Sequence, residues 1–167
     1  MFLRISRWLA VLFMIPALVL AAGPDFRLKD VEGKEHNVNE YIGKGQWTVV
    51  AVWSADCPIC RRDIHQMTFF HDEHRKNKAT VLGLSIDGDR NKARGFIEDQ
   101  SLNFPNLVGE VDDAVRLSNT MFIGTPTYYF FSPDGKFMAQ RIGPVSQKQA
   151  EQVIDELEKK PKSPKKG

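Results

Sequence analysis

Behind the N-terminal segment, three apolar runs have the length and composition of β-strands. They are TVVAVW at 48–53, ATVLGLSI at 79–86 and TYYFF at 127–131. Short runs that are rich in β-branched and aromatic side chains are typical of strands covered on both faces. We therefore predict that these three segments form the centre of a sheet.

Helical patterns fill the segments between these runs. A helix is expected from Pro58 to about Lys76, where the proline suits the first turn because its missing N–H would be unpaired there anyway. A last helix is expected behind Ser146, which forms a capping box with Gln149. Apolar faces mark three further helical segments: Ala93, Phe96 and Ile97; Val111, Ala114, Val115 and Ser118; and Ala150, Val153, Ile154 and Leu157.

Two hairpins complete the pattern. Residues 25–38 indicate two short strands around a turn at Gly33, and Asp134-Gly135 turns the strand at 127–131 back on itself. A further short strand is expected at FPNLV, residues 104–108. The chain thus runs from a hairpin through three β–α pairs to a second hairpin and a last helix. This order predicts an α/β fold with one central mixed sheet and helices on both faces.

The charge of the chain is distributed unevenly. The net charge of +2 includes two arginines in residues 1–22 and five lysines in residues 159–167, and neither segment contains an acid. The stretch 23–158 holds 16 basic and 21 acidic residues, which argues against a nucleic-acid-binding surface. We expect 159–167 to be a disordered, solubilising tail, with contact to an anionic membrane surface as the weaker alternative.

Residues 1–22 have the pattern of a secretory signal peptide. Two arginines precede a 15-residue apolar run that ends in small residues, so cleavage is expected near Ala21 or Ala22. The run is shorter than the roughly 20 residues of a membrane span and contains Pro16, although an uncleaved anchor remains the alternative. We predict one folded domain at 23–158, exported to the periplasm or a similar compartment where disulfides persist.

Cys57 and Cys60 are the two cysteines of the chain, and three non-catalytic interpretations apply to them. A structural clip is unfavourable, because closing so short a loop stabilises by roughly 2 kcal/mol, against about 4.7 kcal/mol for a 100-residue loop. A zinc site needs four ligands, and we expect His65, His71 and His74 on the following helix to be solvated and poorly placed to supply them. Copper stays open, because Cu(I) accepts thiolates at low coordination number.

A redox-active pair fits the pattern better. A cysteine at a helix N-terminus faces unpaired N–H groups, which stabilise the thiolate, and Arg61 and Arg62 add positive charge. We expect an exposed Cys57 to attack and a buried Cys60 to resolve the mixed disulfide. Pro126, in the GTPT segment at the start of a strand, is a candidate for a cis peptide bond.

The chain resembles the thioredoxin superfamily, and within it the secreted TlpA/ResA-like thiol-disulfide oxidoreductases. The residues that carry the likeness are DFRLKDVEGKEHNVNEYIGK, VVAVWSADCPIC, VLGLSIDGD, FPNLVGEVDDAVRLSNTMFIGTPTYYFFSPDGK and IGPVS. The resemblance implies a thioredoxin-like fold with an N-terminal β-hairpin extension and a strand–helix insertion before a cis-proline loop. It also implies that this loop, Thr125-Pro126, faces the cysteines and docks an extended client. The active-site loop would comprise Trp53, Asp56, Pro58 and Ile59.

Three positions depart from the family pattern. Asp56 stands where many members have tryptophan, and its charge should oppose thiolate formation. Ala51 stands where an acid or amide often assists proton transfer; Glu98 and Asp63 are candidate substitutes. The dipeptide Pro58-Ile59 places proline after the first cysteine rather than before the second, which is associated with more oxidising pairs.

The resemblance implies a thiol-disulfide oxidoreductase that needs no cofactor or metal. We expect a monomeric reductant that acts on exported disulfide-containing proteins and is recharged by a membrane-embedded electron donor. Asp56 supports this direction because it favours the disulfide form. A peroxiredoxin is the nearest alternative, but its characteristic threonine four residues ahead of the reactive cysteine is missing, since Trp53 stands at that position. A copper-handling protein is the other alternative.

Overall fold

The computed structural model describes residues 23–159, which form one seven-stranded sheet in the order β2-β1-β5-β4-β3-β6-β7. The predicted signal peptide and almost all of the predicted tail lie outside the described residues; Lys159, assigned to the tail, instead closes the last helix. The strands are β1 (Arg27–Asp30), β2 (Glu35–Asn37), β3 (Trp47–Trp53), β4 (Ala79–Ser85), β5 (Asn106–Val108), β6 (Thr127–Phe131) and β7 (Phe137–Ile142). The helices are η1 (Val38–Glu40), α1 (Pro58–Asp63), α2 (His65–His74), α3 (Arg90–Asp99), α4 (Val111–Ser118) and α5 (Gln147–Lys159).

Strand β3 lies in the interior of the sheet, between β4 and β6, and all seven of its residues are buried. It runs parallel to β4 and antiparallel to β6, and β4 runs parallel to β5. Alternate side chains enter different cores: Ala51 and Trp53 enter one, and Val50 and Val52 enter the other. The predicted apolar runs therefore form the middle of a mixed sheet, as expected.

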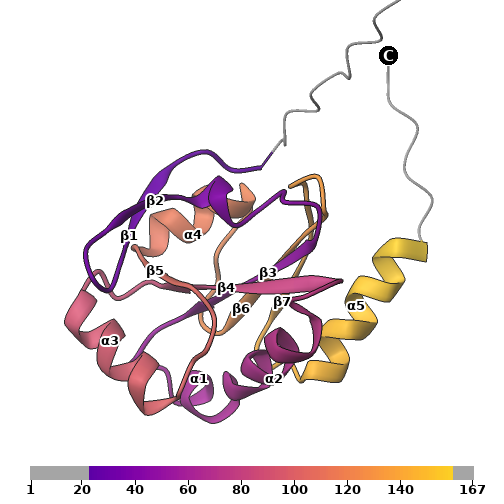
Figure 1. Ribbon diagram of the computed structural model, residues 1–167. Coiled ribbons are helices and arrows are strands. Elements are labelled where there is room, and N and C mark those ends of the chain that lie inside the picture. Colours follow the sequence, from indigo (N-terminus) through magenta and orange to yellow (C-terminus); the bar gives the residue numbers. More distant parts are fainter. Residues whose placement is uncertain (1–22, 160–167) are drawn as a thin grey trace, which may run out of the picture.

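Helices cover both faces of this sheet (Figure 1). One core is closed by α1, α2, α3 and α5 and contains Cys60, Phe70, Phe96 and Ile154. The opposite core is closed by α4 together with the segment around η1. The N-terminal hairpin β1–β2 joins the sheet by pairing with β5, which belongs to the predicted strand–helix insertion β5–α4. The predicted fold class is confirmed.

Two helix predictions need correction. The helix expected from Pro58 to about Lys76 is interrupted at Ile64, where the N–H of Met67 bonds to the Ile64 carbonyl, one residue closer than in an α-helix. In α4 the predicted apolar face is partly wrong, since Val111 and Val115 are exposed. The helix instead buries Ala114, Leu117 and Ser118, a second set with helical spacing.

Among the described residues, no helix is both long and apolar enough to cross a membrane.

Candidate active site

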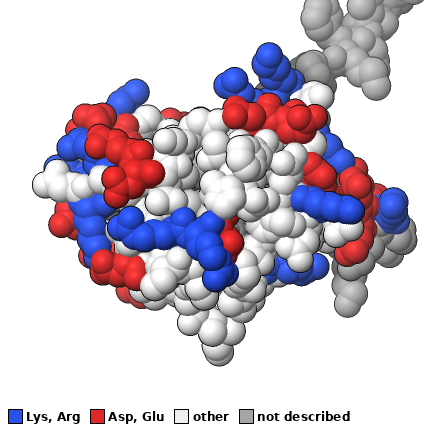
Figure 2. Space-filling view, turned by 90° about the horizontal axis from the view of Figure 1, so that it is seen from below, with Lys and Arg blue, Asp and Glu red and all other residues white. Residues whose placement is uncertain are grey.

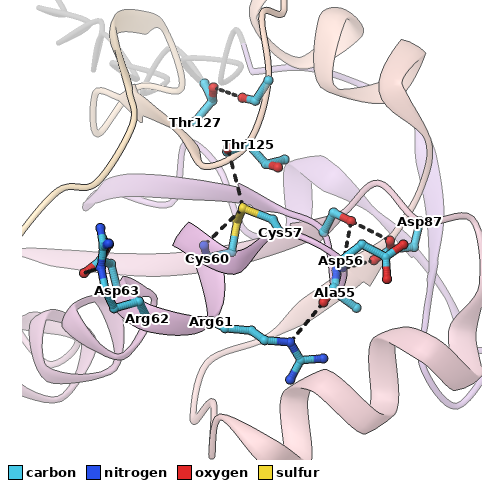
Figure 3. The surroundings of a disulfide bond; sticks show 12 residues. Ala55, Asp56, Cys57, Cys60, Arg61, Arg62, Asp63, Asp87, Thr125 and Thr127 are labelled. Atoms are coloured by element: carbon cyan, nitrogen blue, oxygen red, sulfur yellow. Dashed lines mark hydrogen bonds and ion pairs between the residues drawn. A yellow bond between two sulfur atoms is a disulfide. The ribbon is translucent and has the colours of Figure 1, made fainter.

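The two cysteines lie where β3 gives way to α1. The strand ends at Trp53, a short loop follows, and Cys57 is the N-cap residue of α1, with Pro58 in the first turn. Cys57 and Cys60 form a disulfide with their Cα atoms 5.2 Å apart (Figure 3). The predicted start of the helix is thus confirmed, and it brings both sulfurs to the carboxyl end of β3.

The two sulfurs occupy different environments. Cys60 is fully buried in the core beneath α1, as predicted. Cys57 is half-buried rather than exposed, because the loop before β6 lies against it. The backbone N–H of Cys60 points at Cys57 Sγ across 3.1 Å. When the pair is reduced, this N–H can stabilise a thiolate on Cys57, the sulfur that solvent can reach.

The loop before β6 faces the disulfide. The Thr125–Pro126 peptide bond is cis, as the sequence predicted, and Pro126 is buried. The carbonyl oxygen of Thr125 lies 3.5 Å from Cys57 Sγ (Figure 3). Thr125 precedes the first residue of β6, Thr127, whose hydroxyl donates to the Gly124 carbonyl and so holds the turn. Backbone at Thr125 is therefore beside the reachable sulfur.

A buried carboxylate, Asp87, anchors the loop that leads to Cys57. It follows β4, the parallel neighbour of β3, so the two strands deliver both segments to the same edge of the sheet. Asp87 accepts hydrogen bonds from the Ser54 hydroxyl at 2.7 Å and from the Ala55 N–H at 2.9 Å. Burial raises the pKa of Asp87, but these hydrogen bonds and those from Ser85 and Lys92 lower it by more, so the carboxyl stays ionised at neutral pH.

Arg61 holds the same loop from the other side. Its Nε donates to the Ala55 carbonyl at 3.2 Å, and its guanidinium lies 3.5 Å from Asp99 and over the Phe96 ring. Both backbone groups of Ala55 are thus bonded to side chains from outside the loop. The position of the following cysteine is fixed by these contacts rather than by the loop alone.

Asp56 does not stand as an isolated negative charge. Its carboxylate forms an ion pair with Lys92 of α3, and the same ammonium lies 3.3 Å from Asp87 Oδ1. Local sequence marks Asp56 but not its partner, which is 36 residues away. Asp87 was not predicted either, although one signal pointed to it: a polar residue directly behind a buried strand that neighbours the cysteine-bearing strand.

A family model described as AhpC/TSA family matches residues 19–140 of the chain. The chain belongs to the AhpC/TSA family. It is 25% identical over 138 residues to the thiol-disulfide oxidoreductase ResA of Geobacillus thermodenitrificans, covering 82% of this chain and 76% of that protein. It is 23% identical over 134 residues to the sporulation thiol-disulfide oxidoreductase A of Bacillus subtilis, covering 78% of each. The predicted TlpA/ResA-like character is confirmed.

Solved structures share the fold of this AhpC/TSA family member. A thiol:disulfide interchange protein of the thioredoxin family from Chlorobium tepidum superposes with a TM-score of 0.68 at 19% identity, covering 81% of this chain and 94% of that one. A DsbF homologue from Corynebacterium diphtheriae superposes with a TM-score of 0.69 at 20% identity, covering 80% and 85%. At these identities the likeness establishes the fold, so the predicted thioredoxin-like fold is confirmed.

The other residues assigned to the active-site loop divide into two groups. Pro58 and Ile59 lie at the surface of α1 beside the disulfide, and the Ile59 side chain is exposed. Trp53 instead belongs to β3 and is fully buried. Its indole N–H donates to Asn106 Oδ1 at 3.2 Å and its ring stacks on Phe96, so it supports the site from the core rather than lining the loop.

Ala51 stands where related proteins often have an acid or amide, and its surroundings in the structure include a buried tyrosine. Ala51 is buried, and its cross-strand partner on the same face is Tyr128, whose hydroxyl has no hydrogen-bond partner within the described residues. Burial raises the pKa of Tyr128 well above its ordinary value. Of the two candidate acids, Asp63 is partly buried and paired with Arg62, and Glu98 is exposed on α3. The negative charge of Asp63 also raises the pKa of Tyr128, so Asp63 acts on the cross-strand partner of Ala51.

The histidines behind the cysteines were expected to be solvated, and for His71 this is wrong. His71 is buried, and its Nδ1 accepts a hydrogen bond from the Val81 N–H at 3.1 Å, which ties α2 to β4. His74 pairs with Glu151 of α5 at 2.9 Å, and His65 is half-buried. Within residues 23–159, no group of three or more His, Cys, Asp or Glu side chains is arranged to hold a metal ion.

Proposed function

We propose that this AhpC/TSA family member is a thiol-disulfide oxidoreductase that uses Cys57 to attack and Cys60 to resolve. The observation that carries the proposal is the asymmetry of the pair. One sulfur is reachable and lies 3.5 Å from a backbone carbonyl at Thr125, while the other is fully buried behind it. The oxidoreductase names of the ResA and sporulation relatives support the same activity.

The exchange proceeds in two steps. The Cys57 thiolate attacks one sulfur of a client disulfide, an S–S bond forms between enzyme and client, and the second client sulfur leaves as a thiolate that takes up a proton. The Cys60 thiol then loses its proton and attacks Cys57 Sγ. This forms the intramolecular disulfide and releases the first client sulfur as a thiol. The client gains two electrons and the enzyme is oxidised.

The client docks, in this proposal, against the Thr125-Pro126 loop. Exposed apolar side chains surround that loop: Met121 and Ile123 precede it, and Ile59 lies next to Cys60 in the chain. On the face seen from below, a group of positively charged side chains reaches the middle, with uncharged surface on either side of it (Figure 2). The exposed apolar side chains of Met121, Ile123 and Ile59 suit an extended protein segment better than a small charged substrate.

We propose that electrons flow from this protein to exported clients. The apolar N-terminal segment supports export, with residues 1–22 acting as a signal peptide, and a compartment kept oxidising by other machinery needs a reductant for disulfides that must be opened. A membrane-embedded donor would restore the dithiol. We further propose that the protein acts as a monomer.

Equilibration with glutathione buffers tests the direction, and reduction of a model protein disulfide tests the activity. A potential below about −200 mV supports a reductant, whereas a value near about −120 mV identifies a strong oxidant and contradicts it. Cys57→Ser should abolish exchange, and Cys60→Ser should trap the mixed disulfide with the client. Consumption of peroxide without disulfide exchange would instead favour the peroxiredoxin alternative.

A further inference from the structure

Lys92 connects two carboxylates that differ greatly in burial. Its ammonium pairs with Asp56, whose side chain is 78% exposed, and with Asp87, whose side chain is 4% exposed. Lys92 belongs to α3, outside the loop that carries the cysteines. The lysine of a neighbouring helix therefore contacts both the exposed carboxylate of the redox loop and the buried carboxylate that anchors this loop.

The pairing with Asp56 matters because that residue directly precedes Cys57. A carboxylate beside the attacking sulfur repels a second negative charge and so disfavours the thiolate. The positive charge of the Lys92 ammonium, paired with the same carboxylate, offsets this repulsion. The hydrogen bond to Asp56, and then the one to Asp87, raise the pKa of the Lys92 ammonium, so it remains charged across the neutral range.

Asp87 fixes where this positive charge sits. Its carboxylate is held by the Ala55 N–H and by the hydroxyls of Ser54 and Ser85. Because the same carboxylate accepts from Lys92, the lysine is tied to the framework that places the redox loop. A lysine paired with Asp56 alone would be a surface ion pair of small and variable effect.

We propose that Lys92 is a positioning residue for disulfide exchange: held by the buried Asp87, it neutralises Asp56 and thereby sets the stability of the Cys57 thiolate. The inference rests on the proposed function, since it assigns a partner to the attacking cysteine. It assigns Lys92 no contact with the client and no proton-transfer step.

The two arginines of α1 pair with other carboxylates, and Arg61 also donates to the Ala55 carbonyl of the loop. On α1, Arg61 reaches Asp99 and Arg62 pairs with Asp63. On the opposite side, the segment 120–126 contains no ionisable side chain. Asp56 directly precedes Cys57 in the chain, and Lys92 is the cation that pairs with it.

The test is a set of variants measured for redox equilibrium and for thiolate formation. Lys92→Met leaves both carboxylates uncompensated, so the glutathione equilibrium should move about threefold toward the disulfide, which corresponds to a fall of about 14 mV. The ultraviolet absorbance of the thiolate should appear at higher pH in the reduced variant. Asp56→Asn removes the repelling charge and should move both readouts the opposite way.

Three controls separate positioning from a general effect of charge or folding. Lys92→Arg keeps the positive charge and should retain the wild-type potential. Arg90→Met removes one positive charge from the same helix, but this guanidinium lies against Gly33 in the β1–β2 turn and should leave both readouts unchanged. The double variant Asp56→Asn/Lys92→Met removes both charges and should return to within about twofold of the wild-type equilibrium.

The inference is overturned if Lys92→Met keeps the wild-type potential and thiolate titration, or if Arg90→Met shifts them equally. An unchanged Asp56→Asn variant would also overturn it, and this variant serves if Lys92→Met does not fold. Failure of the proposed function looks different. The wild-type protein would then exchange no protein disulfide, while the thiolate titration would still report whether Lys92 acts on Cys57.

Discussion

Cys60 is fully buried behind Cys57, the half-buried sulfur that lies beside the Thr125 carbonyl. The two cysteines of one disulfide therefore differ in their access to solvent and to any second molecule. This difference, more than the spacing of the cysteines, supports the separate roles that we propose for them. It also leads directly to a chemical test.

Alkylation of the reduced protein with limiting reagent should label Cys57 first. Its sulfur reaches the surface and faces the Cys60 N–H, which favours the reactive thiolate, whereas the Cys60 side chain has no exposed surface. Peptide mapping by mass spectrometry would quantify the two products. Denatured protein is the control and should be labelled at both sites at similar rates. Preferential labelling of Cys60 in the folded protein would reverse the roles.

Removal of the Asp87 carboxylate should loosen the redox loop. Asp87→Ala leaves the Ala55 N–H and the Ser54 hydroxyl without their acceptor, which should lower the free energy of unfolding by about 1–3 kcal/mol. Urea denaturation measures this loss, and disulfide exchange should slow in parallel because Cys57 is less well placed. Asp87→Asn retains an acceptor and should lose less.

Glu73→Ala is a matched control for Asp87→Ala, because Glu73 is an exposed acid on α2, away from the loop. Its effect should stay within about 0.5 kcal/mol. Equal losses for Asp87→Ala and Glu73→Ala would show that the buried carboxylate does not anchor the loop.

The apolar pattern predicted most of the fold because burial of the central strands leaves a local signature. The run at 48–53 became β3, and Asp134-Gly135 formed the expected turn between β6 and β7. The interruption at Ile64 left no such signature, since neither glycine nor proline marks it. In α4, two overlapping sets of apolar residues have helical spacing, and only packing against the sheet decides which one is buried.

Those parts of the candidate site that depend on neighbouring residues in the sequence could be predicted. The helix N-terminus at Cys57 and the proline before β6 both follow from neighbouring residues. The charge balance did not, because Lys92 meets Asp56 only after two β–α units have folded. Because its carboxylate is paired with Lys92, Asp56 favours the disulfide form less than the sequence alone predicts.

Lowering the pH should destabilise the protein partly through His71. Burial, followed by the positive charge of Arg75, lowers the pKa of His71 below its ordinary value of 6.5. His71 therefore binds a proton more readily in the unfolded chain than in the folded protein. The stability due to neutral His71 is fully present above about pH 6.5 and is lost as the pH falls toward the pKa of His71 in the folded protein. The free energy of unfolding should fall by no more than about 1.4 kcal/mol per pH unit from this one group.

Urea denaturation between pH 7 and about pH 5 measures this dependence. His71→Gln can still accept the Val81 hydrogen bond but does not titrate, so the unfolding free energy should fall less steeply with pH. His65→Gln, at a half-buried position on the same helix, should keep the wild-type slope. Identical slopes for wild type and His71→Gln would remove His71 as the cause.

Gly83 should not tolerate a side chain, because β4 packs closely against Asn106 and Trp53 beneath the redox site. A Cβ atom on Gly83 would lie 1.8 Å from Asn106 Oδ1 and 3.1 Å from the indole nitrogen of Trp53. Asn106 would have to move, and the hydrogen bond that it accepts from Trp53 would break. Gly83→Ala should therefore destabilise the protein by about 1–3 kcal/mol and change the tryptophan fluorescence of the folded state.

Gly95→Ala provides the opposite expectation within the same protein. Gly95 lies inside α3, and a Cβ atom there meets no other atom within 4 Å. Alanine restricts the unfolded chain and favours the helix, so this variant should be more stable by about 0.5–1 kcal/mol. Because both changes add one methyl group, opposite effects of the two variants would show that the loss at Gly83 comes from its surroundings and not from the methyl group itself. If Gly83→Ala proves as stable as Gly95→Ala, the close packing of β4 against Asn106 does not support the site.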